Sequence, residues 1–263
     1  MPTKSSSKSP ARRTAAVNPA FDWRRIAYHT LVSRALDDAE ETTNRNRATV
    51  PKEHLVLYQF SARGHEMAQV MLGSLLTGRR DAAGAYYRSR PLLLSVGLSI
   101  EDALASPLGR SGGFSDGRDI GVVCNLPRRE GVTVLPMSGD VGSQYTPSAG
   151  WAQAITYYRD ALKDRAYAGS MSVALGGEGS VATNGFWSAL TMATTLKLPM
   201  LFYIEDNGLG ISVAGDMQTP GGDIAANLAS FGNLLVRDGD GTNPDEAARL
   251  LKEVVDHVRA GKG

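Results

Sequence analysis

The chain has 263 residues, of which 42% are hydrophobic, and its formal net charge is +1. This length and apolar content suit one compact α/β body. The near-neutral charge gives no reason to expect a nucleic-acid partner, and no stretch approaches the roughly 18 apolar residues of a membrane span. The single cysteine, Cys124, excludes an intrachain disulfide framework and a cysteine zinc site, and the four histidines are too scattered for a metal cluster.

The first twenty residues form a compositionally distinct segment. They contain Lys4, Lys8, Arg12 and Arg13, no acidic residue, and many Ser, Ala and Pro residues. We predict a disordered basic tail over 1–20. An organelle transit peptide has the same composition, so the expected location is the cytoplasm or, if the tail is such a peptide, an organelle matrix.

The first half of the chain is predicted to be mainly helical. Apolar residues at near-helical spacing predict helices over 21–43 and 64–76. The stretch 84–104 follows and is interrupted by Pro91. Residues 108–129 are rich in Gly, Arg and Asp, which predicts a long exposed loop.

The second half alternates between strands and helices, which is typical of a parallel sheet with helical crossovers. Thr146 and Asn243 precede prolines and are candidate N-cap residues. Helices are predicted over 146–164, 181–197, 221–232 and 243–260, and strands over 171–177, 198–206 and 233–240. The fold class is therefore predicted to be α/β, with a mainly parallel sheet flanked by helices. We expect the domain to cover 21–263.

Two glycine-containing turns carry the residues that suggest a ligand site. Glu178 lies in the turn GGEGS, and Asn207 lies in EDNGLGIS, each directly after an apolar strand. The two residues are 29 positions apart (207 − 178), about the size of one strand–helix–strand unit. Ligands of such sheets bind beyond the carboxyl ends of the strands, so we expect the two turns to meet there.

The residue types at these turns suit a metal-bridged phosphate group. A carboxylate from Glu178, an amide oxygen from Asn207 and the carbonyl of Leu209 are the oxygen ligands that Mg²⁺ prefers. The N–H groups of Gly179 and Ser180 lie where a helix begins and suit phosphate oxygens. Each turn by itself has a structural interpretation as an ordinary tight turn, and only the pair at this spacing favours a site.

The surrounding sequence resembles a known family. The segment GGEGSVATNGFWSALTMATTLKLPMLFYIEDNGLGIS contains the thiamine diphosphate–Mg²⁺ motif, in which Gly-acid-Gly is followed about thirty residues later by Asn. The chain from about residue 25 onward resembles the alpha subunit, or the N-terminal alpha half of a fused alpha–beta chain, of the decarboxylating component of 2-oxoacid dehydrogenases. The branched-chain and pyruvate enzymes are its best-known members. This resemblance implies the thiamine diphosphate-binding fold.

The resemblance also implies roles for individual residues. YYRSRPLLL is similar to the family segment that reaches the diphosphate, and an arginine there pairs with phosphate oxygens. SGDVGSQYTPSAG is similar to the segment under the bent cofactor, with Val141 as the apolar wedge. Structural roles stay open for Arg88, Val141 and His65. The residues implied to contact the cofactor are Tyr87, Arg88, Ser138, Val141, Gly177, Gly179, Ser180 and Ile211, and those implied to bind Mg²⁺ are Glu178, Asn207 and Leu209.

The chain departs from the family pattern at three places. Glu178 stands where Asp is more usual, and Glu205 stands where some relatives place an arginine near the diphosphate. The family continues into a loop with paired histidines, whereas this sequence ends at Gly263. We therefore expect a truncated alpha half or a piece of a longer chain.

The implied activity is oxidative decarboxylation of a 2-oxoacid with transfer of the acyl group to a lipoyl group on an acyltransferase. In the family, the glutamate that activates the cofactor belongs to the beta subunit or beta half, so no catalytic residue is assigned to this chain. We expect the chain to be inactive alone. The alternative from another class is a non-catalytic, alpha-like binding or regulatory chain. A dinucleotide-binding domain is disfavoured because GGEGSVATNG does not match G-x-G-x-x-G.

Overall fold

The computed structural model describes most of the chain, and nothing is said of the remaining stretches. The predicted basic tail over 1–20 and part of the predicted loop over 108–129 fall in them. The described residues are 21–56, 58–118, 126, 131–136 and 138–262.

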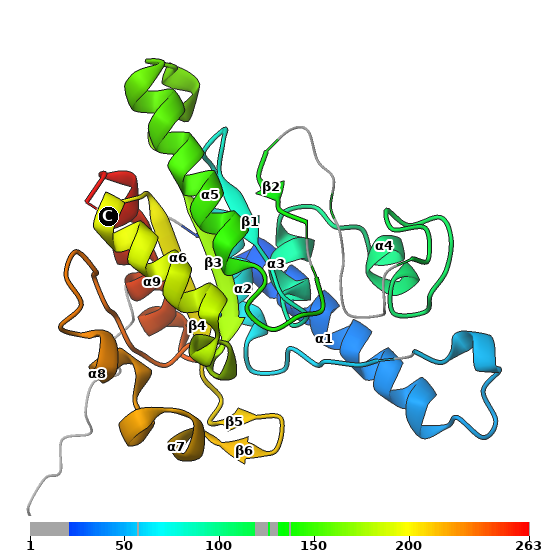
Figure 1. Cartoon of the computed structure of the whole chain (residues 1–263). Helices are drawn as coiled ribbons and strands as arrows, with labels where there is room; N and C mark the ends of the chain where they lie inside the picture. The colour runs from blue at the N-terminus through cyan, green and yellow to red at the C-terminus, as the bar shows by residue number, and fades with distance from the viewer. Residues whose placement is uncertain (1–20, 57, 119–125, 127–130, 137, 263) are drawn as a thin grey trace, which may run out of the picture.

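A four-stranded parallel sheet lies at the centre of the molecule (Figure 1). The order across the sheet is β2 (Thr133–Val134), β1 (Ala82–Gly84), β3 (Ser172–Gly177) and β4 (Met200–Glu205). A separate antiparallel hairpin, β5 (Leu209–Gly210) and β6 (Val213–Ala214), follows β4.

Helices form the remainder of the fold, together with short helical turns. The 3₁₀ turns cover Lys52–His54, Arg165–Tyr167, Glu178–Ala182 and Pro220–Gly222, and a π-helical turn covers Tyr157–Ala161. The α-helices are α1 (Trp23–Arg45), α2 (Glu66–Leu75), α3 (Arg90–Ser95), α4 (Ile100–Ala105), α5 (Tyr145–Thr156), α6 (Asn184–Leu196), α7 (Gly215–Gln218), α8 (Ile224–Leu228) and α9 (Pro244–Arg259).

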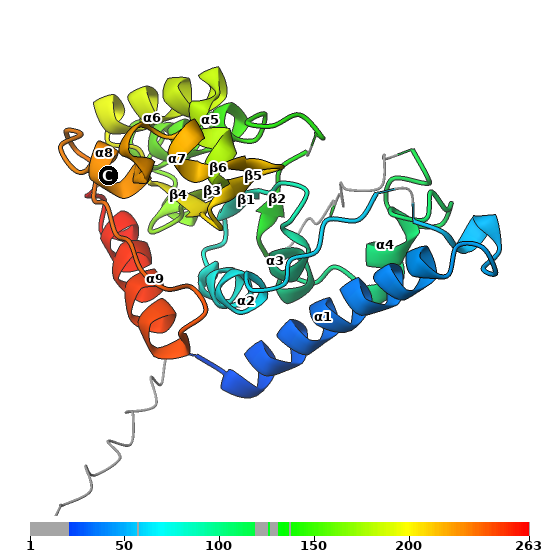
Figure 2. The same ribbon diagram turned by 90° about the horizontal axis from the view of Figure 1, so that it is seen from below.

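The helices cover both faces of the sheet, as Figure 2 shows, with α5 and α6 on one face and α2, α3 and α9 on the other. This explains why β3 is apolar along its length rather than alternating. Val173 and Leu175 of β3 belong to the core under α2 and α9, whereas Ala174 belongs to the core under α5 and α6. The prediction of an α/β fold with a mainly parallel sheet flanked by helices is confirmed.

The unit β3–α6–β4 sets the position of the two motif turns. The strands run parallel in a register that pairs Ser172 with Met200 and Gly177 with Glu205. Thr183 caps α6 by accepting a hydrogen bond from Phe186 N, and Lys197 ends the helix in the left-handed conformation at φ 51°. The strand–helix–strand spacing read from the sequence is therefore confirmed.

Several helix predictions are confirmed with altered boundaries. The α9 helix begins as predicted, with the Asn243 side chain accepting from two backbone N–H groups and Pro244 in the first turn. Thr146 is not the N-cap of α5, because the helix begins one residue earlier at Tyr145. Pro91 does not interrupt a helix but lies in the first turn of α3, where its missing N–H costs nothing. The α8 helix is shorter than predicted.

The predicted strand over 233–240 is wrong, because residues 234–240 form no strand and belong to neither sheet. Leu234 and Val236 pack against the core under α6, so their apolar pattern reports side-chain burial rather than backbone pairing. The short strands β1 and β2 were not predicted. Their few residues are too short a run for a period-2 pattern to be recognised.

No helix among the described residues is both long enough and apolar enough to cross a membrane.

Candidate functional site

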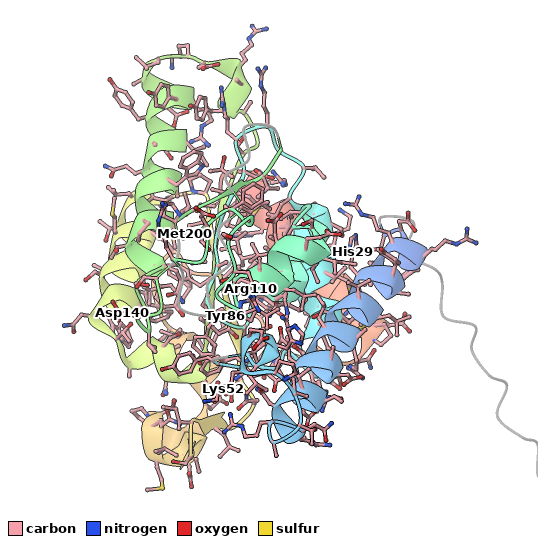
Figure 3. All side chains as sticks on the ribbon, turned by 90° about the vertical axis from the view of Figure 1, so that its right-hand side faces the viewer. His29, Lys52, Tyr86, Arg110, Asp140 and Met200 are labelled. Atoms are coloured by element: carbon pink, nitrogen blue, oxygen red, sulfur yellow. The ribbon has the colours of Figure 1, made fainter. Side chains whose placement is uncertain are left out.

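The segments that follow all four parallel strands meet at one cavity of about 200 Å³. They are the turn after β1, the loop after β2, the turn after β3 and residues 206–211 after β4, which we call the metal loop because two of the predicted Mg²⁺ ligands, Asn207 and Leu209, lie there. Tyr86 and Asp140, which line this cavity from the first two segments, are labelled in Figure 3. The cavity thus lies at the carboxyl edge of the sheet, where parallel α/β folds bind ligands.

All eleven residues singled out from the sequence line this one cavity, although they come from four separate segments of the chain. Their binding roles stay predictions. The residues brought together are Tyr87, Arg88, Ser138, Val141, Gly177, Glu178, Gly179, Ser180, Asn207, Leu209 and Ile211.

Glu178 has the most informative environment in the cavity. The residue is 5% exposed, and its Oε1 atom has no hydrogen-bond partner. Burying a carboxylate oxygen without a donor is costly, and a bound cation removes that cost. The donor set therefore fits a metal ion at this position.

The metal loop is shaped by its own side chains. Asn207 Oδ1 accepts from Leu209 N at 3.0 Å, and Asp206 Oδ1 accepts from Gly208 N at 2.8 Å. Each Asx turn folds the loop back toward the turn after β3. The described residues contain no group of three or more His, Cys, Asp or Glu side chains that could hold a metal. A metal here would rely on amide, carbonyl and phosphate oxygens besides the single carboxylate, as Mg²⁺ often does.

Gly176, near the end of β3, has no room for a side chain. A Cβ on Gly176 would lie 2.0 Å from the Tyr145 hydroxyl and 2.6 Å from Ser180 Oγ. Ser180 Oγ is 2.5 Å from that hydroxyl and donates to the Gly177 carbonyl at 2.5 Å. The serine side chain therefore stabilises the turn, and its backbone N–H is the predicted phosphate contact.

Arg88 reaches the cavity from the turn after β1. Its Nη1 donates to the Ser61 carbonyl, and its guanidinium carbon lies 5.7 Å from the ring centroid of Tyr87. The Tyr87 ring in turn contacts Phe60, with centroids 4.6 Å apart. Arg88 is half-buried and oriented before any ligand binds.

A network of buried charges holds the segment around Ser61, whose carbonyl accepts the hydrogen bond from Arg88. Asp37 of α1 is fully buried and accepts from Ser61 Oγ and Ala62 N, both at 2.9 Å. Arg90 forms ion pairs with Asp37 and Glu40. Burial raises the pKa of Glu40, and the hydrogen bond from Arg90 opposes this.

The opposite side of the cavity is apolar and exposed. Val141 is 56% exposed and Leu209 is 55% exposed, while Ile211 is fully exposed at the tip of the β5–β6 hairpin. Ile211 has φ 58°, an unusual conformation for a β-branched residue. Such strain is often found at functional positions. Ser138 is also exposed, and its hydroxyl accepts from Asp140 N at 3.1 Å.

Other cavity residues were not assigned from the sequence. Glu205, Tyr86, Gln218 and His65 also line the cavity. A charged residue at the end of an apolar strand is the signal that marks Glu205. Burial raises its pKa to about 7, opposed by hydrogen bonds from Tyr86 and Gln69 and by the charge of Arg88, while the charge of Glu178 adds to the rise.

His65 lies between this cavity and a second cavity of about 780 Å³ along the outer edge of β4. Its Nδ1 is 3.8 Å from Glu205 Oε1. Burial, and then the charge of Arg88, lower the pKa of His65, while Glu66 opposes them. The neutral imidazole is therefore favoured at this position.

Residues 36–263 match the family model described as the dehydrogenase E1 component. The chain belongs to the dehydrogenase E1 component family. Members generally depend on thiamine diphosphate, and their alpha subunits generally associate with a beta subunit in a multienzyme complex.

Curated relatives agree with this family. The chain is 30% identical over 202 residues to the pyruvate dehydrogenase E1 component subunit alpha of Zymomonas mobilis, covering 76% of this chain and 53% of that protein. It is 27% identical over 236 residues to the 2-oxoisovalerate dehydrogenase subunit alpha of Bacillus subtilis, covering 89% of this chain and 65% of that protein. The chain thus spans less than two thirds of the length of both relatives. The predicted family and the alpha-subunit type are confirmed.

Proposed function

We propose that this chain forms the diphosphate- and Mg²⁺-binding half of the active site of a thiamine diphosphate-dependent 2-oxoacid dehydrogenase. The observation that carries the proposal is the buried Glu178 Oε1 atom without a hydrogen-bond partner, at a cavity also lined by Asn207 and Leu209. A cation would satisfy this oxygen and would join it to the phosphate oxygens of a cofactor.

The residues of the cavity divide into two groups by chemistry. Glu178, Asn207 and the Leu209 carbonyl would hold Mg²⁺, while Arg88 and the backbone of Gly179 and Ser180 would bind the diphosphate. Tyr87 lies beside Arg88 and would contact the same cofactor.

The exposed side chains on the other side of the cavity would bind the organic part of the cofactor. Val141 and Ile211 would cover its rings and exclude water from them. Bound thiamine diphosphate supplies the carbon nucleophile needed to decarboxylate a 2-oxoacid, so the protein's share of the work is binding and orientation.

The proposed reaction is oxidative decarboxylation of pyruvate or a branched-chain 2-oxoacid, with acyl transfer to a lipoyl group. A beta subunit or beta half would supply the activating glutamate, and a lipoyl acyltransferase would accept the acyl group. The two curated relatives named above divide between a pyruvate and a 2-oxoisovalerate enzyme, so both substrates stay in the proposal. The retained set of cavity residues argues against a non-catalytic alpha-like chain.

The proposal is tested by titrating the chain with thiamine diphosphate and Mg²⁺ in a calorimeter. We expect binding that requires both, and we expect Glu178→Ala to weaken it at least about tenfold, because a metal ligand is lost. Glu101→Gln removes an exposed carboxylate on α4 and is the control, which should bind like the wild type. Equal binding by all three chains would contradict the assigned metal site.

Activity is tested on the complex that co-purifies with the tagged chain. The assay measures decarboxylation of a panel of 2-oxoacids with an artificial electron acceptor, with and without the cofactor and Mg²⁺. Turnover that needs both would support the reaction, and the preferred acid would identify the substrate. Turnover by the isolated chain would contradict the expected need for a beta half.

A further inference from the structure

Glu205 is a buried acid at the edge of the proposed diphosphate site. It is the last residue of β4 and is 4% exposed. Gln69 Nε2 donates to its two carboxylate oxygens at 2.9 and 3.1 Å, and the Tyr86 hydroxyl donates to Oε2. A carboxylate would repel a bound diphosphate electrostatically, so the presence of Glu205 here calls for a structural explanation.

Both donors to Glu205 are linked to the turn that carries the predicted cofactor contacts. Tyr86 belongs to this turn, and Gln69 is hydrogen-bonded to it. Tyr86 directly precedes Tyr87 and Arg88 in the chain. Gln69 Nε2 also donates to the Arg88 carbonyl at 3.0 Å, and Gln69 Oε1 accepts from Leu92 N at 3.3 Å. Gln69 thus connects the end of β4 to this turn and to α3, which follows it.

The packing around the cluster leaves Glu205 little freedom. Gln69 is fully buried and Tyr86 is 6% exposed. The groups that face Glu205 are the cation Arg88, the acid Glu178 and the imidazole of His65. A buried carboxylate that accepts several hydrogen bonds restrains its donors, and leaving such donors unpaired is costly.

We propose that Glu205 is a positioning residue that anchors the turn 86–89 to the end of β4 and thereby sets Tyr87 and Arg88 for the diphosphate. Its effect on cofactor binding rests on the proposed function, whereas the anchoring itself does not. A purely electrostatic role makes the opposite prediction, because removing a negative charge beside a diphosphate tightens binding.

The anchor is tested first without any cofactor, by amide hydrogen exchange on the full chain. Glu205→Gln and Tyr86→Phe should each speed exchange in residues 86–92 by about tenfold, because each removes a buried hydrogen bond of the cluster. Tyr203→Phe is the control: it removes a hydroxyl from the same strand without altering the donors to Glu205, and it should leave this segment unchanged. Unchanged exchange in both test variants would overturn the anchor.

The second arm measures the affinity for thiamine diphosphate with Mg²⁺ in the same chains. Weaker binding by Glu205→Gln and Tyr86→Phe, by about tenfold, is expected if the turn sets the diphosphate contacts. Tighter or equal binding by Glu205→Gln would overturn the positioning role. Absence of binding by the wild type would contradict the proposed function, and the exchange comparison would still decide whether Glu205 anchors the turn.

Discussion

Two walls of the cavity are held in place by different kinds of interaction. The inner wall is Arg88, which lines the cavity, together with the residues behind it, Asp37, Ser61 and Arg90; hydrogen bonds and ion pairs cross-link them around the fully buried Asp37. The outer wall presents apolar side chains to solvent on α7, the β5–β6 hairpin and the loop before α5. Val141, Leu209 and Ile211 line the cavity, Val213 and Met217 belong to the adjoining hairpin and α7, and all five are at least 40% exposed.

This difference separates what folding provides from what binding must provide. The inner wall is ordered by the chain's own charges, so Arg88, the predicted phosphate contact, is set in advance. The outer wall has no comparable network among the interactions described, and burying its apolar side chains requires a ligand or a partner surface. The end of the cavity proposed to bind the diphosphate is therefore prearranged, and we expect the other end to become ordered on binding.

The largest effect is expected from Arg90→Met, which removes the cation from the inner wall. Asp37 and Glu40 would then be two buried acids without their cation, and the free energy of unfolding should fall by about 3–5 kcal/mol. Denaturant unfolding measures the loss. Arg237→Ala is the control, since its ion pair with Glu253 is exposed on both sides and should contribute far less to stability. Equal losses in the two variants would contradict the comparison.

A smaller loss of stability is expected from Gly176→Ala near the end of β3. The new methyl group would clash with Tyr145 and Ser180 and should cost about 1–3 kcal/mol of unfolding free energy. Gly177→Ala is the control on the adjacent residue, because its Cβ would meet only the Glu205 carbonyl, at 3.8 Å. Thermal unfolding of both variants distinguishes them. A larger loss at Gly177 would show that the turn is not limited by space.

Ile211→Asn is expected to act in the opposite direction on stability. Asparagine tolerates the left-handed conformation, so relieving the strain at φ 58° should raise the free energy of unfolding by about 1 kcal/mol. Affinity for thiamine diphosphate should fall, because the predicted contact with its ring is lost. Unfolding and calorimetry on one preparation measure both. A stability loss would argue that the hairpin depends on this side chain.

The smallest response is expected at the inner wall when the cofactor binds. Thiamine diphosphate with Mg²⁺ should slow amide exchange in the metal loop and the hairpin over 207–214, and chelation of the metal should reverse this. Residues 59–62 should show no measurable change, because they are already held by Asp37. A response confined to 59–62 would reverse the assignment of the two walls.

The motif residues were predictable because their relation is local. Glu178 and Asn207 follow consecutive strands of one strand–helix–strand unit, and parallel pairing of those strands places their ends side by side. Arg88 and Val141 could be added only through the family resemblance, since they lie in segments far away along the chain. The loop over 233–240 was misread because an apolar run reports burial and not pairing.

By itself, the sequence determined the α/β class, the two turns at the sheet edge and the family to which the chain belongs. The fold class and the turns follow from periodicity and spacing within short segments, and the family follows from motifs that resemble those of its members. Only the tertiary structure decided that Asp37 supports Arg88 and that Glu205 faces Gln69 and Tyr86. Those contacts join residues up to 136 positions apart, and long-range packing of buried polar groups leaves no periodic trace in a single chain.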